Sequence, residues 1–185
     1  MPSIESLAPQ FQTDGRSGSQ KMATFHLTTQ CNLSCDYCYS LDNVNLDLPE
    51  WNAYEAEPMV QTLASLGYRV SLGGGEPTFV PDRMIPLLEL CCDAGIPCSV
   101  LTNGHLLDEP LLRTLKEKHC QWVQISIDHK KDVELLQPAF EIGRRLGLRM
   151  AAGSVWDAED CEDAFAIYDM LRNTGGVAWR ILKRT

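Results

Sequence analysis

The chain has 185 residues, of which 44% are hydrophobic and 22% charged, and its net charge is −9. This length suits one domain with a single sizeable core. The negative charge disfavours binding to nucleic-acid phosphates, so small molecules, peptides or proteins are the expected partners. No apolar run approaches the length of a membrane span and no signal-peptide pattern is present, so we expect no membrane binding and a cytoplasmic location.

The first segment, residues 1–21, contains the Gly-, Ser- and Gln-rich stretch "QTDGRSGSQ" and is expected to form a flexible N-terminal arm. The rest, residues 22–185, alternates between two patterns and is predicted to be one domain. Short runs typical of strands begin at positions 22, 69, 98, 122, 148 and 177. Helical patterns lie between them, at about 54–66, 82–94, 108–118, 132–146 and 158–173.

This alternation of strands and helices predicts a parallel sheet with helical crossovers, an α/β architecture. After the longer first unit, the strand starts are 24 to 29 residues apart, which fits one strand and one helix. A complete eightfold barrel takes about 250 residues, so we predict a partial (β/α)6 TIM-like barrel with an open side. The sequence ends shortly after the last strand, so a sixth helix is expected to be missing. Pro138 is expected to kink or delay the fourth helix.

Three cysteines, Cys31, Cys35 and Cys38, lie in the segment "CNLSCDYC" after the first predicted strand. Their spacing would also suit one face of a helix, but the surrounding residues favour turns. A structural zinc site or an ordinary ferredoxin cluster takes four ligands, and the sequence has no second cysteine pair at the right spacing. Three thiolates would hold a [4Fe–4S] cluster by three corners and leave one iron open, which is a catalytic arrangement.

The other cysteines and the histidine of the first strand are interpreted as structural. Cysteines in a reducing compartment serve as ligands, reactive groups or small core residues. His26 is interpreted as a core histidine with satisfied hydrogen bonds. We predict that five cysteines are packing residues: Cys91, Cys92, Cys98, Cys120 and Cys161.

Three more polar segments end the next three strands. In "SLGGGEPTF", residues 71–79, the glycines allow the backbone to approach a ligand, and the exposed amides and carbonyls can bind a charged group, although a purely structural turn is equally consistent. "LTNG", residues 101–104, favours a turn. "ISIDH", residues 125–129, places Ser126 and Asp128 on one side, where they can hydrogen-bond a ribose or an amine. Ligands of parallel α/β folds bind at the carboxyl ends of strands, so these segments predict one shared site.

Together these motifs resemble the radical S-adenosylmethionine (radical SAM) superfamily over residues 22 to about 182. The C-x3-C-x2-C spacing, with an aromatic residue, Tyr37, before the last cysteine, is similar to the cluster motif of that family. The resemblance implies that Cys31, Cys35 and Cys38 bind a [4Fe–4S] cluster. It also implies that the amine and carboxylate of S-adenosylmethionine coordinate the fourth iron, and that Tyr37 lies against the adenine.

The resemblance implies further cofactor contacts at the later strand ends. The "GGEP" segment is similar to the element that binds the methionine amino group, and "TNG" resembles a segment that lines the cofactor pocket. "SID" is also similar to the family pattern, except that His129 stands where glycine is usual, which leaves the conformation of that turn open. The implied cofactor-binding residues are Tyr37, Gly74, Gly75, Glu76, Pro77, Thr102, Asn103, Ser126 and Asp128.

The last two strands carry weaker candidates. The fifth strand does not show the glycine-and-isoleucine pattern that many family members have, and Gly153 and Ser154 are the candidates there. In the sixth strand Arg180 could face the barrel and bind a carboxylate, although a lone strand arginine is often a surface or paired residue.

The resemblance implies reductive cleavage of S-adenosylmethionine to a 5′-deoxyadenosyl radical, which abstracts a hydrogen atom from a substrate. The motifs look most like those of peptide- and protein-modifying members, although the C-terminal auxiliary-cluster domain is absent from this sequence. A peptide or protein substrate is therefore predicted, with a glycyl-radical-enzyme activase or a small-molecule synthase as alternatives. An electron donor such as flavodoxin or ferredoxin is the implied partner. A non-catalytic iron–sulfur electron-transfer module is the alternative of another class, and the missing fourth thiolate argues against it.

Overall fold

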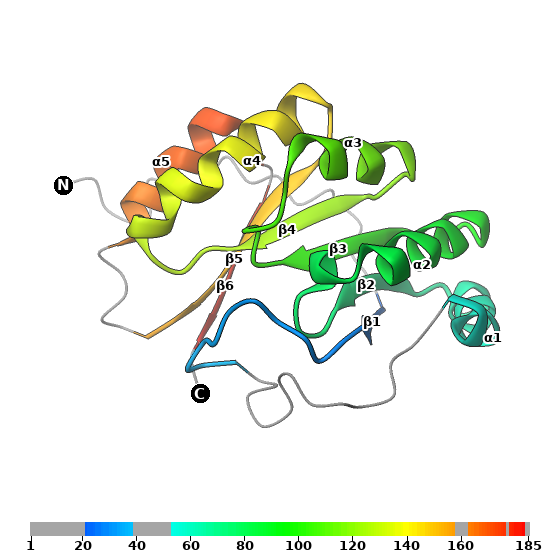
Figure 1. Cartoon of the computed structure of the whole chain (residues 1–185). Helices are drawn as coiled ribbons and strands as arrows, with labels where there is room; N and C mark the ends of the chain where they lie inside the picture. The colour runs from blue at the N-terminus through cyan, green and yellow to red at the C-terminus, as the bar shows by residue number, and fades with distance from the viewer. Residues whose placement is uncertain (1–20, 39–52, 158–162, 177, 184–185) are drawn as a thin grey trace.

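Six parallel strands form one curved sheet in the computed structural model, which describes residues 21–38, 53–157, 163–176 and 178–183 (Figure 1). The strands follow one another across the sheet in chain order, and every neighbouring pair is parallel. In the described residues β1 and β6 are the two edges of the sheet, so the predicted open-sided partial barrel is confirmed. The strands are β1 (Met22–His26), β2 (Arg69–Gly73), β3 (Cys98–Thr102), β4 (Trp122–Ser126), β5 (Met150–Trp156) and β6 (Ala178–Lys183).

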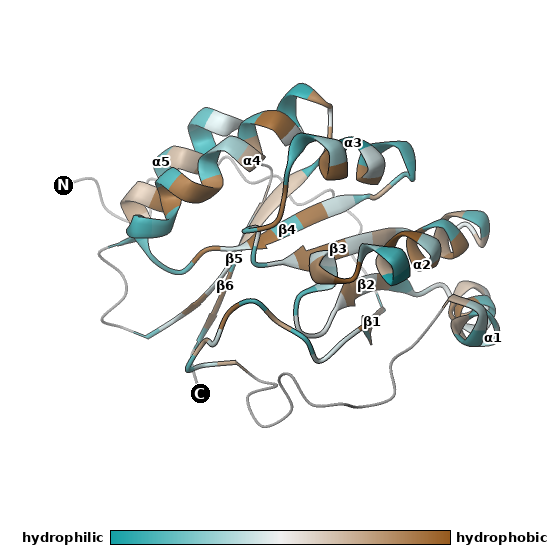
Figure 2. Ribbon diagram, in the orientation of Figure 1, coloured by the Kyte–Doolittle hydropathy of each residue, from teal (hydrophilic) through white to brown (hydrophobic). Residues whose placement is uncertain are grey.

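Helices connect the strands and cover one face of the sheet (Figure 1). Their apolar sides face the strands and their polar sides face outward (Figure 2). Two short 3-10 turns, η3 (Pro77–Phe79) and η4 (Lys130–Asp132), follow β2 and β4. The helices are α1 (Ala53–Ser65), α2 (Pro81–Asp93), α3 (Glu109–Glu117), α4 (Val133–Arg145) and α5 (Ala164–Thr174). The predicted elements are thus confirmed, with the first residues of the fifth predicted helix, 158–162, outside the described residues.

The core lies between the helices and the sheet. Alternate strand residues such as Leu72, Val100 and Ile125 are fully buried there against helix residues such as Leu88 and Phe140. Full burial of one such side chain contributes roughly 1.5–3 kcal/mol. The other set of strand residues points to the opposite face, which none of the described helices covers and which is called the inner face below.

All five described helices end in the same way. The residue after the last turn has positive φ, and a backbone amide one residue later donates to a carbonyl five residues back, which is a Schellman motif. Glycine fills the left-handed position after α1, α2, α4 and α5, whereas His119 fills it after α3 with φ 59°. The amide-to-carbonyl bonds are Tyr68 to Leu63, Ile96 to Cys91, Cys120 to Leu115, Leu148 to Gly143 and Gly176 to Leu171.

Pro138 lies inside α4, which begins at Val133, so the expected delay of the helix does not occur. Its exposed position lets the ring project to solvent while Leu136 and Phe140 on either side are buried. Two other helices also contain an exposed proline, Pro58 in α1 and Pro86 in α2.

Three of the five cysteines predicted to pack are buried, namely Cys91, Cys98 and Cys120, and Cys92 is half-buried. Burial raises the pKa of the Cys120 thiol to about 12. The hydrogen bond with Cys91 and burial raise the pKa of Cys98. These directions keep both thiols protonated and inert, as expected of core residues. Cys161 lies outside the described residues.

No helix in the described residues is long and apolar enough to cross a membrane. The expected N-terminal arm, residues 1–21, lies outside the described residues except for Lys21, and it stays a prediction.

Candidate functional site

The segment that carries the three cysteines crosses the carboxyl ends of the strands. It leaves β1 and runs over the mouth of the sheet toward β5 and β6 (Figure 1). This segment, residues 27–38, is called the cysteine loop below. We predicted from the sequence that the segments after β2, β3 and β4 belong to the same site. Each of them is hydrogen-bonded to the cysteine loop, as described below.

Backbone hydrogen bonds hold the start of the cysteine loop against the turn after β2. The Leu27 amide donates to the Gly73 carbonyl at 2.9 Å. The amides of Gly75 and Glu76 donate to the carbonyls of Thr28 and Gln30, at 2.7 and 2.8 Å. The loop therefore begins as a continuation of the sheet rather than as an independent excursion.

The glycines of this turn are required by the cysteine loop. Gly74 has φ +120°, and a Cβ there would lie 2.7 Å from the Thr28 carbonyl oxygen. At Gly75 a Cβ would lie 2.1 Å from the Gln30 oxygen, so no other residue fits without moving the backbone. We expected exposed amides in this turn to be open for a charged ligand. That expectation is wrong for Gly75 and Glu76, whose amides are already used by the loop.

Glu76 is a buried hub between β2 and β3. Its side chain is 1% exposed, and both carboxylate oxygens accept hydrogen bonds. Oε1 accepts from the Thr78 amide at 3.0 Å, the Thr78 hydroxyl at 2.6 Å and the Thr102 hydroxyl at 2.7 Å. Oε2 accepts from the Asn103 amide at 2.7 Å. Four donors within the protein offset the desolvation of this carboxylate.

Asn103 extends this hub to the middle of the cysteine loop. Its side-chain amide donates to Oδ1 of Asn32 at 2.8 Å. Thr102 is buried, and its hydroxyl accepts from the Gly104 amide at 2.9 Å. The structure thus brings the predicted residues Glu76, Thr102 and Asn103 together, in contact with the loop between Cys31 and Cys35.

Asp128 holds the far end of the loop. It is 6% exposed, and its Oδ2 accepts a hydrogen bond from the Tyr37 hydroxyl. Its Oδ1 accepts from the Val155 amide at 2.6 Å, and its backbone carbonyl accepts from the Trp156 indole at 2.8 Å. Burial and the bond to Asp128 raise the pKa of the Tyr37 hydroxyl, which therefore stays a donor.

The three thiols themselves lie half-buried in the loop, and none is part of a disulfide. The Leu33 amide donates to the Cys31 sulfur at 3.4 Å, and the Cys38 amide donates to the Cys35 carbonyl at 3.2 Å. Burial raises the pKa of Cys35, and its contact with the Tyr37 hydroxyl opposes that rise. Across the described ranges, no three His, Cys, Asp or Glu side chains converge on the position of a single metal ion. A cubane cluster needs no such convergence, because each thiolate binds a different iron.

Other residues considered from the sequence take different places. Ser126 is exposed on the inner face, whereas Asp128 is buried. His26 is exposed rather than a core residue, because β1 turns it to the inner face. His129 has φ −129° and ψ 148°, an extended conformation that does not require glycine. The Ser154 hydroxyl is buried and bonds the Ile127 carbonyl at 2.5 Å.

Sequence reasoning missed Thr78 and Val155 as partners of the two buried carboxylates, and Asn32 as the partner of Asn103. A local signal existed for Thr78, since an acidic residue followed by Pro and Thr is typical of a helix N-terminus, and Glu76 does cap η3. The contact between Tyr37 and Asp128 joins residues 91 positions apart and had no such signal.

Comparison with known proteins gives a family and a fold. Residues 25–146 match the radical SAM superfamily. Fe-coproporphyrin III synthase of Methanosarcina barkeri is 26% identical over 162 residues, which cover 81% of this chain and 40% of that protein. PqqA peptide cyclase of Gluconobacter oxydans is 33% identical over 106 residues, covering 54% of this chain and 28% of that protein.

The crystal structure of Streptococcus suis SuiB bound to the precursor peptide SuiA matches with a TM-score of 0.79 at 17% identity. The match covers 90% of this chain and 40% of SuiB, and it shows a shared fold. The chain therefore spans at most 40% of the length of each of these three proteins.

Proposed function

Because the chain belongs to the radical SAM superfamily, we propose that it is a radical SAM enzyme in which Cys31, Cys35 and Cys38 hold a [4Fe–4S] cluster. The cofactors of this family are such a cluster and S-adenosylmethionine. When bound, they supply one-electron cleavage of S-adenosylmethionine and removal of a hydrogen atom from a substrate.

The observation that carries this proposal is the clamped cysteine loop. It holds three thiols at the carboxyl ends of the strands, where α/β folds bind ligands. Its start, middle and end are each hydrogen-bonded to a different strand end, at Gly75, Asn103 and Asp128. The donor set fits the cluster, because three thiols bind three irons and leave the fourth for a cofactor.

The predicted cofactor residues divide into two kinds. Tyr37 and Ser126 are not fully buried, so we propose that they contact S-adenosylmethionine directly. The amides of Gly75 and Glu76 are occupied, and we propose that the turn serves the amino group through its carbonyl oxygens, which are the acceptors that an amine needs. Glu76 and Asp128 are buried and hydrogen-bonded within the protein, so they act by holding the loop and its neighbours in place.

Reductive cleavage of the cofactor tests the proposal. The full chain is reconstituted with iron and sulfide without oxygen, reduced with dithionite and given S-adenosylmethionine, and 5′-deoxyadenosine is measured by mass spectrometry. The wild type is expected to form it, whereas Cys31→Ala, Cys35→Ala and Cys38→Ala lose both the cluster absorbance and the product. Cys92→Ala, outside the loop, is the matched control. If one of the three loop variants keeps full turnover, the ligand assignment is wrong.

A peptide or protein is the proposed substrate class. Two of the similar proteins carry a peptide in their names, a peptide cyclase and a SuiB complex with a precursor peptide. The inner face of the sheet supports this, since described residues on β1, β4 and β6 are exposed there and leave room for a large substrate. A small molecule is the second candidate, because Fe-coproporphyrin III synthase matches over the largest share of the chain among the sequence relatives compared.

The proposed electron donor is a small redox protein such as flavodoxin or ferredoxin. Cleavage of the cofactor needs one electron per turnover, and a reduced redox protein of this kind can supply it. Replacing dithionite by a reduced flavodoxin or ferredoxin is expected to sustain formation of 5′-deoxyadenosine.

A further inference from the structure

Several small residues lie on the inner face of the sheet near its carboxyl end. One row of residues crosses this face through the pairs Leu101 with Gln124, Gln124 with Ala151, and Ala151 with Ala178. Gly73 faces the same side, because a Cβ there would meet the Leu101 side chain at 3.6 Å. Glycine and alanine at three of these positions place little side-chain volume on this part of the inner face.

The next row, closer to the cysteine loop, contains Ser126, Gly153 and Arg180 side by side on β4, β5 and β6. Gly153 has no side chain between the other two. A Cβ at Gly153 would lie 2.5 Å from Nε2 of Gln124, so the Gln124 amide occupies the space above this glycine. The amide of Gln124 therefore lies over Gly153, and Arg180 is the register partner of this glycine on β6, so two side chains that can donate hydrogen bonds flank residue 153.

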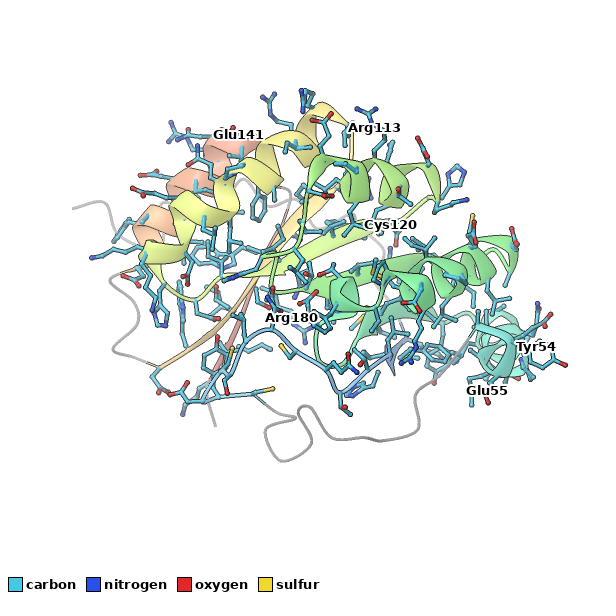
Figure 3. The ribbon with its side chains drawn as sticks, in the orientation of Figure 1. Tyr54, Glu55, Arg113, Cys120, Glu141 and Arg180 are labelled. Carbon is cyan, nitrogen blue, oxygen red and sulfur yellow. The ribbon has the colours of Figure 1, made fainter. Side chains whose placement is uncertain are left out.

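Arg180 has no partner in the part of the chain that the structure describes. It is exposed, and within the described residues it takes part in no hydrogen bond or ion pair. Figure 3 labels it between the strands and the cysteine loop, whereas the labelled Arg113 lies at the outer surface and pairs with Glu109. The two buried carboxylates of the site, Glu76 and Asp128, are already bound to other groups. An arginine in this position is available to bind an acidic group of a ligand.

We propose that Arg180 and Gln124 form a subsite for a carboxylate of the substrate. A guanidinium binds a carboxylate by two parallel hydrogen bonds, and a neighbouring side-chain amide supplies a third donor. The two rows contain no acidic residue that would compete. The inference rests on the proposed function, because this subsite serves a substrate only if the cofactor binds above it.

The carboxylate of S-adenosylmethionine is the wrong occupant for this subsite. It shares a carbon atom with the amino group, which we assign to the turn after β2. That turn lies four strands from β6, and each strand spacing is about 4.8 Å along the sheet. Arg180 is therefore left for the molecule that reacts with the activated cofactor.

Deuterium transfer tests the subsite without knowing the substrate. Two deuterated mixtures from cells grown in D2O serve as donors, a peptide digest and a small-molecule extract, each with its carboxylates left free or converted to amides. The fraction of 5′-deoxyadenosine that carries deuterium is then measured. Because this is a fraction, it does not depend on how much enzyme is active. The mixture that labels the product tells whether the carboxylate comes from a peptide or from a small acid.

We expect amidation of the donor and Arg180→Gln each to lower the labelled fraction at least about tenfold, as for loss of a charge-assisted pair. The labelled fraction of Arg180→Lys should lie between those of the wild type and Arg180→Gln, since lysine keeps the charge but cannot form two parallel hydrogen bonds. Arg172→Gln, an exposed arginine of α5, is the matched control and should match the wild type.

Equal labelling from free and amidated donors, equal labelling by the Arg180→Gln and Arg172→Gln variants, or no labelling from either mixture overturns the subsite. So does a rise in the KM for S-adenosylmethionine in Arg180→Gln, which would assign the arginine to the cofactor. Failure of the wild type to form any 5′-deoxyadenosine is a separate result, because it removes the proposed function itself.

Discussion

Two buried carboxylates brace the cysteine loop from opposite sides, and they do so with different kinds of partner. Glu76 accepts from two backbone amides, those of Thr78 and Asn103, and from two hydroxyls. Asp128 accepts from one backbone amide, that of Val155, and from the Tyr37 hydroxyl. Glu76 joins β2 to β3, whereas Asp128 joins the end of the loop to β5.

The difference matters because a backbone amide has a fixed direction and a hydroxyl does not. An amide can only donate, so it needs an acceptor at that exact place. A hydroxyl can rotate and accept instead. Position 76 therefore needs a carboxylate, because two backbone amides point at it. At position 128 the Tyr37 hydroxyl can accept as well as donate, so a donor in place of one carboxylate oxygen is tolerated there. We infer that Glu76 stabilises the strand ends that form the frame of the site, and that Asp128 keeps the end of the cysteine loop in one conformation.

Glu76→Gln is expected to give the largest loss. The new amide nitrogen would face the Asn103 amide, donor against donor, and the charge that binds the other three donors would be lost. The free energy of unfolding should fall by about 2–3 kcal/mol, and the melting temperature by about 5–10 °C. Thermal melting followed by circular dichroism measures this. Glu134→Gln, on the exposed side of α4, is the control and should stay near wild type. A variant that melts with the wild type would refute the role of Glu76 in the frame.

Tyr37→Phe should come second. It leaves Oδ2 of Asp128 buried without this donor, which costs about 1–2 kcal/mol. The loss should be local, because the other partners of Asp128 remain. Hydrogen exchange of the amides in residues 33–38 should speed up while β2 and β3 keep their protection. Uniformly faster exchange over the whole sheet would contradict a role confined to the loop end.

Asp128→Asn should cost less than Tyr37→Phe, about 1 kcal/mol or below. The asparagine oxygen still accepts from Val155, and the Tyr37 hydroxyl can turn to accept from the new amide nitrogen. The two single variants and the double variant form a cycle, measured by urea unfolding. If Asp128→Asn is the costlier change, the charge and not the direction of the donor dominates this contact.

The sequence was sufficient for the frame and insufficient for the contacts that complete the site. Short runs typical of strands and helical spacing located the strands and α-helices of the described residues, since those patterns depend on near neighbours. The same patterns put Glu76, Thr102 and Asp128 at strand ends and therefore at one site. They could not show that Tyr37 reaches Asp128, because that contact depends on how the sheet curves under the loop.

Two further differences have the same origin. The glycines of the "GGEP" turn were read as space for a ligand, and the structure shows that Gly75 makes space for Gln30. His26 was assigned to the core because a short strand does not reveal which of its faces is covered by helices. Both depend on segments far away in the sequence, which local patterns do not report.

His119→Gly should give the smallest change and the only gain. It replaces the one described non-glycine residue with positive φ by the residue that ends the four other helices, so the free energy of unfolding should rise by about 0.5–1 kcal/mol. His119 precedes β4, at the end of the strands opposite the cysteine loop, so exchange in the loop should not change. Gly67→His is the reciprocal control, because a Cβ at Gly67 meets nothing within 4 Å and only its φ of +70° opposes a side chain. Equal and opposite shifts in melting temperature would show that backbone conformation alone sets both. A loss in His119→Gly would instead mean that the imidazole makes a stabilising contact, and stability would then be coupled to the opposite end of the barrel from the two carboxylates.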